Sequence, residues 1–173
     1  MIIGLEGPDG SGKTTLARKI CDEFKMEYYH TGKPNSIEEM TELIKKLADL
    51  PKDKLFVVDR VPWISESVYS FVFERPVTVD YLDVNLHNVI SDVIYCRPAD
   101  DMIKMNTDAH KSYKSEAFKR EVLNRKNRII SRYDKVFELY FGKISINKRT
   151  SLNTIKYDWS SDDFSKIKQF IKE

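Results

Sequence analysis

Short apolar runs alternate with stretches of helical periodicity along this chain of 173 residues. The runs are typical of strands buried on both faces, which carry few polar positions. In the stretches between them, apolar residues return every three or four positions, as one buried face of a helix requires. We therefore expect strands over residues 2–5, 27–30, 55–58, 93–96 and 154–157.

The helical stretches lie between and after these strands. Ser160 and Asp163 have the spacing of a capping box, which predicts the start of the last helix. The alternation of strand and helix favours a parallel sheet covered on both sides, in a three-layer α/β fold with five strands. We expect the other helices directly after residue 14, through residues 40–47, and over residues 65–73, 80–90 and 115–141.

Residues 7–14 read Gly-Pro-Asp-Gly-Ser-Gly-Lys-Thr, a complete G-x-x-x-x-G-K-[ST] phosphate-binding loop. A predicted strand precedes the loop and a predicted helix follows it, which is the context that the motif requires. The glycines let consecutive backbone N–H groups turn inward around a chain of phosphates. Lys13 places a positive charge beside the β- and γ-phosphates, and Thr14 offers a hydroxyl to Mg²⁺. The sequence therefore predicts a phosphate-loop NTPase fold.

A second polar segment follows the predicted strand at residues 55–58. Asp59 can orient Mg²⁺ and its waters, or a sugar hydroxyl, and Arg60 can bind a second phosphate through two parallel hydrogen bonds. Ligands of such sheets bind at the carboxyl ends of the strands, where residues 30–34 and Arg97 also lie. A simple ATPase needs one phosphate site, whereas a kinase needs another for its acceptor. The pair therefore favours a kinase over the alternative of a surface ion pair.

Composition excludes several classes of protein. The chain is 41% hydrophobic with a net charge of +2, as expected for one globular domain over residues 1–173. No apolar run approaches the ~20 residues that span a bilayer, and a strand that begins at Ile2 leaves no room for a signal peptide. Cys21 and Cys96 lack the spacing of metal ligands, which favours reduced core thiols. We expect a cytoplasmic protein without membrane contact.

Positive charge gathers between residues 104 and 132, where nine basic residues accompany three acidic ones and the local charge is +6. We interpret residues 104–120 as a basic lid over the phosphates. The alternative is a helix face exposed to solvent. The lid side chains that could reach the transferred group are Lys111, Lys114, Lys119 and Arg120.

The motifs resemble those of thymidylate kinases. Residues 7–15 are similar to the family's phosphate loop, which commonly reads D-G-S-G-K-T-T. Asp59-Arg60 matches the D-R pair after the third strand, and residues 65–70 resemble the S-S-x-A-Y-Q segment. The short chain is most similar to the thymidylate-kinase-like proteins of bacteriophages, which would place it in the host cytoplasm.

The resemblance implies a role for each matching position. Asp9 faces the 3′-hydroxyl of the acceptor, Arg60 binds its phosphate, and Tyr69 crowds the 2′ position and thereby favours deoxyribose. Thr14 and Asp59 serve Mg²⁺, and ATP is held by Asp9, Gly10, Ser11, Gly12, Lys13, Thr14 and Thr15. The substrate-binding set is Asp9, Lys33, Asp59, Arg60, Tyr69 and Arg97, and the catalytic set is Lys13, Asp59, Arg60, Lys114 and Arg120.

Two departures leave the base of the acceptor open. The family's R-E-P-G segment is replaced by His-Thr-Gly-Lys-Pro at residues 30–34, where Lys33 supplies a charge without the planar fork of arginine. Ser70 stands where the family carries glutamine. Gly10 stands where some members place an arginine, and in such members the lid supplies the missing charge.

We expect transfer of the γ-phosphoryl group of Mg·ATP to a deoxynucleoside monophosphate, with dTMP the leading acceptor. Another acceptor stays open: a different deoxynucleotide, a nucleoside, or a hydroxymethylated base in DNA, the one case in which DNA is a partner. A homodimer also stays open. The alternative of another class is a nucleotide-dependent switch or scaffold. A GTPase is disfavoured because residues 147–150 lack the aspartate of N-K-x-D.

Overall fold

Five strands form one parallel sheet in the order β2-β3-β1-β4-β5. The computed structural model describes residues 1–32, 34, 36–76, 89–90, 92–109, 115–141 and 153–172. Each expected strand is found within one residue of its predicted bounds. The strands are β1 (Ile2–Glu6), β2 (Glu27–His30), β3 (Phe56–Asp59), β4 (Asp92–Cys96) and β5 (Asn153–Tyr157).

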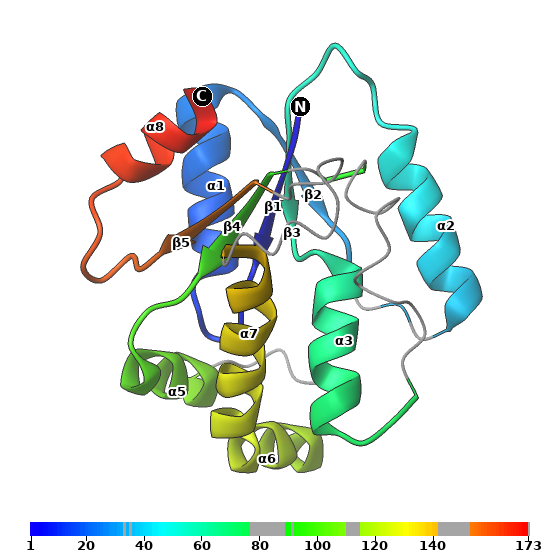
Figure 1. Cartoon of the computed structure of the whole chain (residues 1–173), viewed down its shortest axis with the longest axis vertical. Helices are drawn as coiled ribbons and strands as arrows, with labels where there is room; N and C mark the ends of the chain where they lie inside the picture. The colour runs from blue at the N-terminus through cyan, green and yellow to red at the C-terminus, as the bar shows by residue number, and fades with distance from the viewer. Residues whose placement is uncertain are drawn as a thin grey trace.

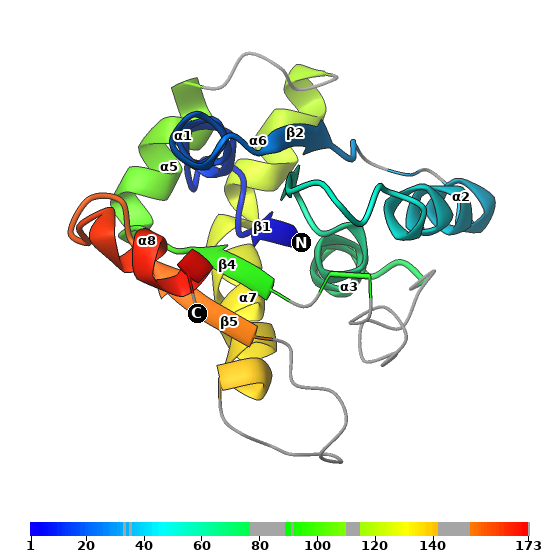
Figure 2. The ribbon, with the colours of Figure 1, turned by 90° about the horizontal axis from the view of Figure 1, so that it is seen from above.

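Helices cover both faces of this sheet (Figures 1 and 2). On one face, α1 (Lys13–Phe24) and α8 (Ser165–Lys172) pack their apolar sides against β1, β3 and β4. On the other face lie α2 (Ile37–Ala48), α3 (Pro62–Val72) and α7 (Lys126–Phe141). Two apolar clusters, one on each side of the sheet, form the core. This arrangement confirms the three-layer α/β fold.

The carboxyl ends of the strands face two further helices, α5 (Asp100–Ala109) and α6 (Glu116–Asn124), in the lower part of Figure 1. Since loops that follow parallel strands gather at this edge, it is where a ligand is expected. No helix among the described residues is long and apolar enough to cross a membrane.

The prediction of one long helix over residues 115–141 is wrong, because the chain turns at Arg125 between α6 and α7. Ser115 caps α6 by accepting a hydrogen bond from the backbone of Phe118. The Arg125 guanidinium donates to the carbonyl of Val72 at 2.7 Å and lies over the ring of Phe73. These contacts hold the turn against the end of α3. Each helix keeps its own apolar side, so the sequence periodicity continues through the break.

The structure differs from the sequence predictions at two other helices, α5 and α8. The α5 helix was not expected, and it takes up the first part of the proposed lid at residues 104–120. Ser160 does not cap α8, because its backbone and hydroxyl bond to Asp158, and α8 begins only at Ser165. The helix expected over residues 80–90 lies almost wholly outside the described residues.

Candidate active site

The phosphate loop connects the end of β1 to the start of α1, as predicted. Gly10 and Gly12 have φ angles of 85° and 84°, a left-handed conformation that favours glycine. A Cβ atom on Gly10 would lie 2.6 Å from the carbonyl oxygen of Ile103, and one on Gly12 would lie 2.8 Å from Nε1 of Trp159. Both glycines are therefore required by backbone shape and by close neighbours.

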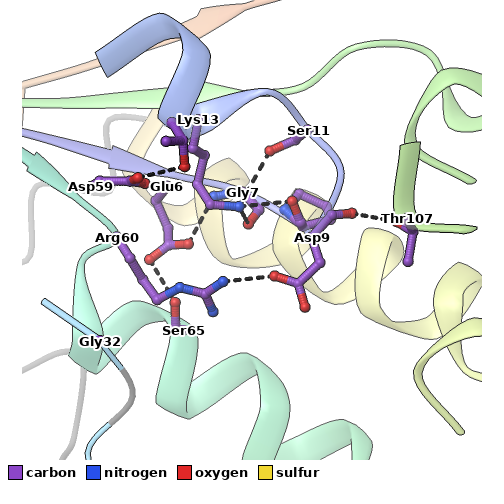
Figure 3. A network of polar contacts seen from close by, with 12 residues as sticks. Glu6, Gly7, Asp9, Ser11, Lys13, Gly32, Asp59, Arg60, Ser65 and Thr107 are labelled. Carbon is purple, nitrogen blue, oxygen red and sulfur yellow. Dashed lines mark hydrogen bonds and ion pairs between the residues drawn. The ribbon is translucent and has the colours of Figure 1, made fainter. Parts of the chain in front are cut away.

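Lys13 is 93% shielded from solvent, although it carries a charged group. Figure 3 shows its side chain beside Gly7 of the loop. Its Nζ donates to the carbonyl oxygens of Gly7 and Pro8 at 2.7 and 2.8 Å. Burial, assisted by the nearby charge of Arg60, lowers the pKa of the Lys13 ammonium. An ammonium so placed gains from an anion in the loop, which supports its predicted role beside phosphates.

Glu6 is a fully buried carboxylate that the sequence prediction missed. Its two oxygens accept from the backbone N–H groups of Gly7 and Val61 at 2.8 and 2.9 Å. They also accept from the hydroxyls of Ser65 at 2.7 Å and Tyr133 at 3.0 Å. Burial raises its pKa, while Arg60 and Lys13 oppose that shift. Glu6 therefore fixes the loop to α3 and α7, and the signal for it was a single acid in an apolar strand.

Arg60 and Asp9 form an ion pair at 2.6 Å, although they are 51 positions apart in the sequence (Figure 3). Burial alone would raise the pKa of Asp9, but Arg60, Lys13 and Lys126 hold it well below the usual value. Arg60 itself has a φ angle of 87°, which costs free energy in a residue other than glycine. The strained backbone directs the guanidinium across the mouth of the loop. The structure thus brings together two of the predicted substrate-binding residues.

Asp59 accepts two hydrogen bonds at the same oxygen, Oδ2. The hydroxyl of Thr14 donates at 2.6 Å and that of Tyr28 at 2.8 Å, while Nδ1 of His30 lies 3.8 Å away. Burial and Asp59 raise the pKa of Tyr28 to about 12, so its hydroxyl stays protonated. The predicted Mg²⁺ residues Thr14 and Asp59 are therefore in direct contact.

The oxygen donors of this pair suit a hard cation such as Mg²⁺. No group of three His, Cys, Asp or Glu side chains in the described part of the chain could hold a metal by itself. In nucleotide-binding sites Mg²⁺ is usually bound by one or two protein oxygens together with the phosphates of the nucleotide.

Distant segments contact the outer side of the phosphate loop. The side chain of Asn106 donates to the carbonyl of Gly10 at 3.1 Å, and that of Trp159 to the carbonyl of Ser11 at 3.0 Å. Thr107, also on α5, donates to the carbonyl of Asp9 at 2.7 Å. These contacts could not be predicted from the sequence, because α5 and the segment after β5 lie far along the chain.

Arg97 lies apart from this cluster, at the end of β4. Its guanidinium donates to both oxygens of Asp134 at 2.8 and 2.9 Å and forms an ion pair with Asp100 at 2.6 Å. It also lines a cavity of about 500 Å³ that extends to Lys156 of β5 and to Asp158, which follows that strand. The structure therefore pairs Arg97 with Asp134 and Asp100, and not with the Arg60–Asp9 pair.

The remaining predicted residues have separate positions. Tyr69 is buried on α3, with its ring between those of Phe73 and Tyr133. Thr15 is exposed on the first turn of α1. Arg120 is exposed on α6, and no hydrogen bond or ion pair joins it to the described residues of the loop. Lys33, Lys111 and Lys114 lie outside the described residues.

Sequence comparisons support nucleotide binding at this loop. A sequence model of the ATPase family associated with various cellular activities (AAA) matches residues 3–66, from β1 into α3. Cytidylate kinase from Chlamydia pneumoniae is 33% identical over 73 residues, which are 42% of this chain. That stretch spans only 30% of the length of the relative.

Solved structures match the chain over nearly its full length. The YorR protein of Bacillus subtilis, in complex with phosphorylated GDP, superimposes with a TM-score of 0.68 at 23% identity, covering 99% of this chain and 95% of that one. Deoxyadenosine kinase from M. mycoides with bound dCTP gives a TM-score of 0.60 at 14% identity, covering 99% and 97%. The chain therefore has the α/β fold of phosphate-loop kinases, with an intact phosphate loop and an aspartate–arginine pair beside it.

Proposed function

We propose that this protein transfers the γ-phosphoryl group of Mg·ATP to the phosphate of a nucleoside monophosphate. The observation that carries the proposal is the Arg60–Asp9 ion pair, because it puts a second cation across the mouth of the phosphate loop. The planar guanidinium of Arg60 can bind a second phosphate through two parallel hydrogen bonds. An enzyme that only hydrolyses ATP has no need of that second site.

Phosphoryl transfer depends mainly on positioning and charge neutralisation, and the site residues fit both tasks. The loop N–H groups and Lys13 bind the β- and γ-phosphates, so the Lys13 ammonium exchanges the carbonyls of Gly7 and Pro8 for phosphate oxygens. Thr14 and Asp59 would hold Mg²⁺, which supplies further neutralisation of the transferred group. Arg60 exchanges Asp9 for the acceptor phosphate and so frees the Asp9 carboxylate to accept from a sugar hydroxyl.

The donor nucleoside has room next to Arg97. The cavity of about 500 Å³ lies between the ends of β4 and β5 and includes Asp158 and Ser161, which flank Trp159. Trp159 itself contacts the loop at Ser11. We therefore assign Arg97 to the donor side of the site, instead of the acceptor side that the sequence favoured.

We propose dTMP as the leading acceptor, on the resemblance of the motifs to thymidylate kinases and on the position of Tyr69. The Tyr69 ring packs edge-on against Tyr133, whose hydroxyl donates to Glu6 at the base of the phosphate loop, so it lies on the side of the site where the acceptor is proposed to bind. Exclusion of one hydroxyl by packing is a modest discriminator, worth roughly 10- to 200-fold. A preference for deoxyribose of that size is the expected result.

A deoxynucleoside kinase is the second candidate. The similarity to deoxyadenosine kinase, which extends over 99% of the chain, favours it. A deoxynucleoside carries no phosphate for Arg60 to bind. The two functions therefore differ in whether Arg60 is needed for acceptor affinity.

The test is ADP release from the purified protein with a panel of acceptors. The panel contains dTMP, dUMP, dCMP, dGMP, dAMP, UMP, CMP, the four deoxynucleosides and DNA that carries a hydroxymethylated base. We expect the highest kcat/KM with a deoxynucleoside monophosphate, and a raised acceptor KM in Arg60→Lys. Activity confined to deoxynucleosides, and unaffected by Arg60→Lys, would establish the second candidate. ATP hydrolysis unaffected by every acceptor would favour a switch or scaffold.

A further inference from the structure

Lys126, the first residue of α7, is 98% shielded from solvent. The sequence marked it only as one of nine basic residues between 104 and 132. Its Nζ donates to the carbonyl oxygen of Asp9, which lies 117 positions earlier in the chain. A buried ammonium is costly unless it serves a partner, so this contact calls for an explanation.

Three segments converge on Asp9. Its carbonyl oxygen accepts from the ammonium of Lys126 and from the hydroxyl of Thr107 at 2.7 Å, while its carboxylate pairs with Arg60. Figure 3 shows Thr107 and Arg60 reaching Asp9 from opposite sides. Lys126 and Thr107 thus fix the peptide plane after Asp9, and with it the direction in which the Asp9 side chain points.

The charges around Lys126 are mostly positive. The groups that act on it are the Asp9 carboxylate on the loop, the Lys13 ammonium at the start of α1 and the Arg60 guanidinium after β3. Glu6 acts in turn on Lys13 and Arg60. Lys13, Arg60 and Lys126 therefore gather three positive charges around the Asp9 carboxylate, and bound phosphates would supply further negative charge.

We propose that Lys126 is a positioning residue of the phosphate site, which orients Asp9 through its carbonyl and holds a proton more tightly when nucleotide phosphates are bound. The inference rests on the proposed function only for its effect on turnover. Its effect on binding needs no acceptor. A buried lysine can change its protonation state when phosphates bind, whereas an arginine stays charged.

The protonation state of Lys126 should change in a measurable direction when a nucleotide binds. Burial, together with Lys13 and Arg60, lowers the pKa of Lys126 to about 8, against the pull of Asp9. Above that pH the amine of the free protein is largely neutral. Bound phosphates favour the ammonium, so nucleotide binding near pH 8 takes up a proton. By linkage, nucleotide affinity falls as the pH rises through this range.

The experiment is calorimetric titration with Mg·ADP at pH 6.5 and 8.5, in pairs of buffers that differ in ionisation enthalpy. The wild type should take up protons at pH 8.5 and few at pH 6.5. Lys126→Arg should bind with no proton uptake at pH 8.5, and Lys126→Met should bind at least tenfold more weakly at pH 6.5. Lys135→Met, a change at an exposed lysine of the same helix, should behave as wild type. Thermal unfolding checks that each variant is folded.

Proton uptake that persists unchanged in Lys126→Arg and Lys126→Met would overturn the inference and assign the uptake to another group, as would the absence of uptake in the wild type. If Mg·ADP binds as expected but no acceptor is phosphorylated, the inference about Lys126 holds and the proposed kinase function fails. If Lys126→Met matches Lys135→Met in affinity, Lys126 has a structural role alone.

Discussion

The two proposed phosphate-binding regions of this molecule are built in different ways. The donor region is one continuous loop between β1 and α1, shaped by backbone hydrogen bonds and by two left-handed glycines. The proposed acceptor region consists of side chains from separate segments, joined by the Arg60–Asp9 ion pair and the contact of Lys126 with Asp9. A backbone site binds any phosphate chain in the same way, whereas a side-chain site can change its ligand by substitution. Specificity is therefore expected to lie in the acceptor region.

The largest effect should come from the donor region. Lys13→Ala removes the charge that stabilises the transferred phosphoryl group, and such a loss typically lowers kcat by ~10²-fold or more. Lys45→Ala on α2, far along the chain from the loop, should keep wild-type turnover. Steady-state kinetics and thermal unfolding of both variants provide the test. Near wild-type turnover in a folded Lys13→Ala protein would place the active site elsewhere.

The acceptor region should respond more selectively. Arg60→Lys keeps the positive charge but loses the planar fork, so the acceptor KM should rise roughly tenfold while the ATP KM changes little. The comparison of the two KM values in one variant separates the regions directly. Equal changes in both would mean that Arg60 serves the donor phosphates.

Backbone shape should matter more in the donor loop than at an open turn. Gly10→Ala introduces a Cβ that meets Ile103 and Thr107, whereas Gly32→Ala has the same sign of φ and, among the described residues beyond its chain neighbours, no atom within 4 Å. We expect Gly10→Ala to lose about 2–3 kcal/mol of unfolding free energy and Gly32→Ala about 1 kcal/mol. Urea unfolding measures both. Equal losses would show that φ strain dominates and that contact with α5 adds nothing.

The smallest effect is on the dependence of stability on pH. Arg60, Lys13 and Lys126 lower the pKa of Asp9 below its ordinary value of 3.8, so its ionised form stabilises the folded state above about pH 4, and that contribution is lost as the pH falls further. Asp9→Asn should therefore lose stability less steeply between pH 5 and 3, by about 1 kcal/mol. Urea midpoints at several pH values decide this. Identical slopes in variant and wild type would remove Arg60 as the partner that matters.

Sequence and structure agree best where the information is local. The phosphate loop and the apolar strands could be predicted, because eight consecutive residues and continuous burial specify them. The separation of α6 from α7 could not, since it depends on the contact of Arg125 with Val72 across the fold. Glu6 and Lys126 look like ordinary charged residues until the fold buries them. The site was thus predictable in its donor half and only partly in its acceptor half.

The central claim is that the guanidinium of Arg60 binds the phosphate of the acceptor. The most direct measurement follows the label of [γ-³²P]ATP in the presence of dTMP and the other monophosphates, with the products separated by chromatography. The account predicts that the label appears in a nucleoside diphosphate, and that Arg60→Lys reduces this product at limiting acceptor. Label found only in inorganic phosphate, with every acceptor present, would contradict it.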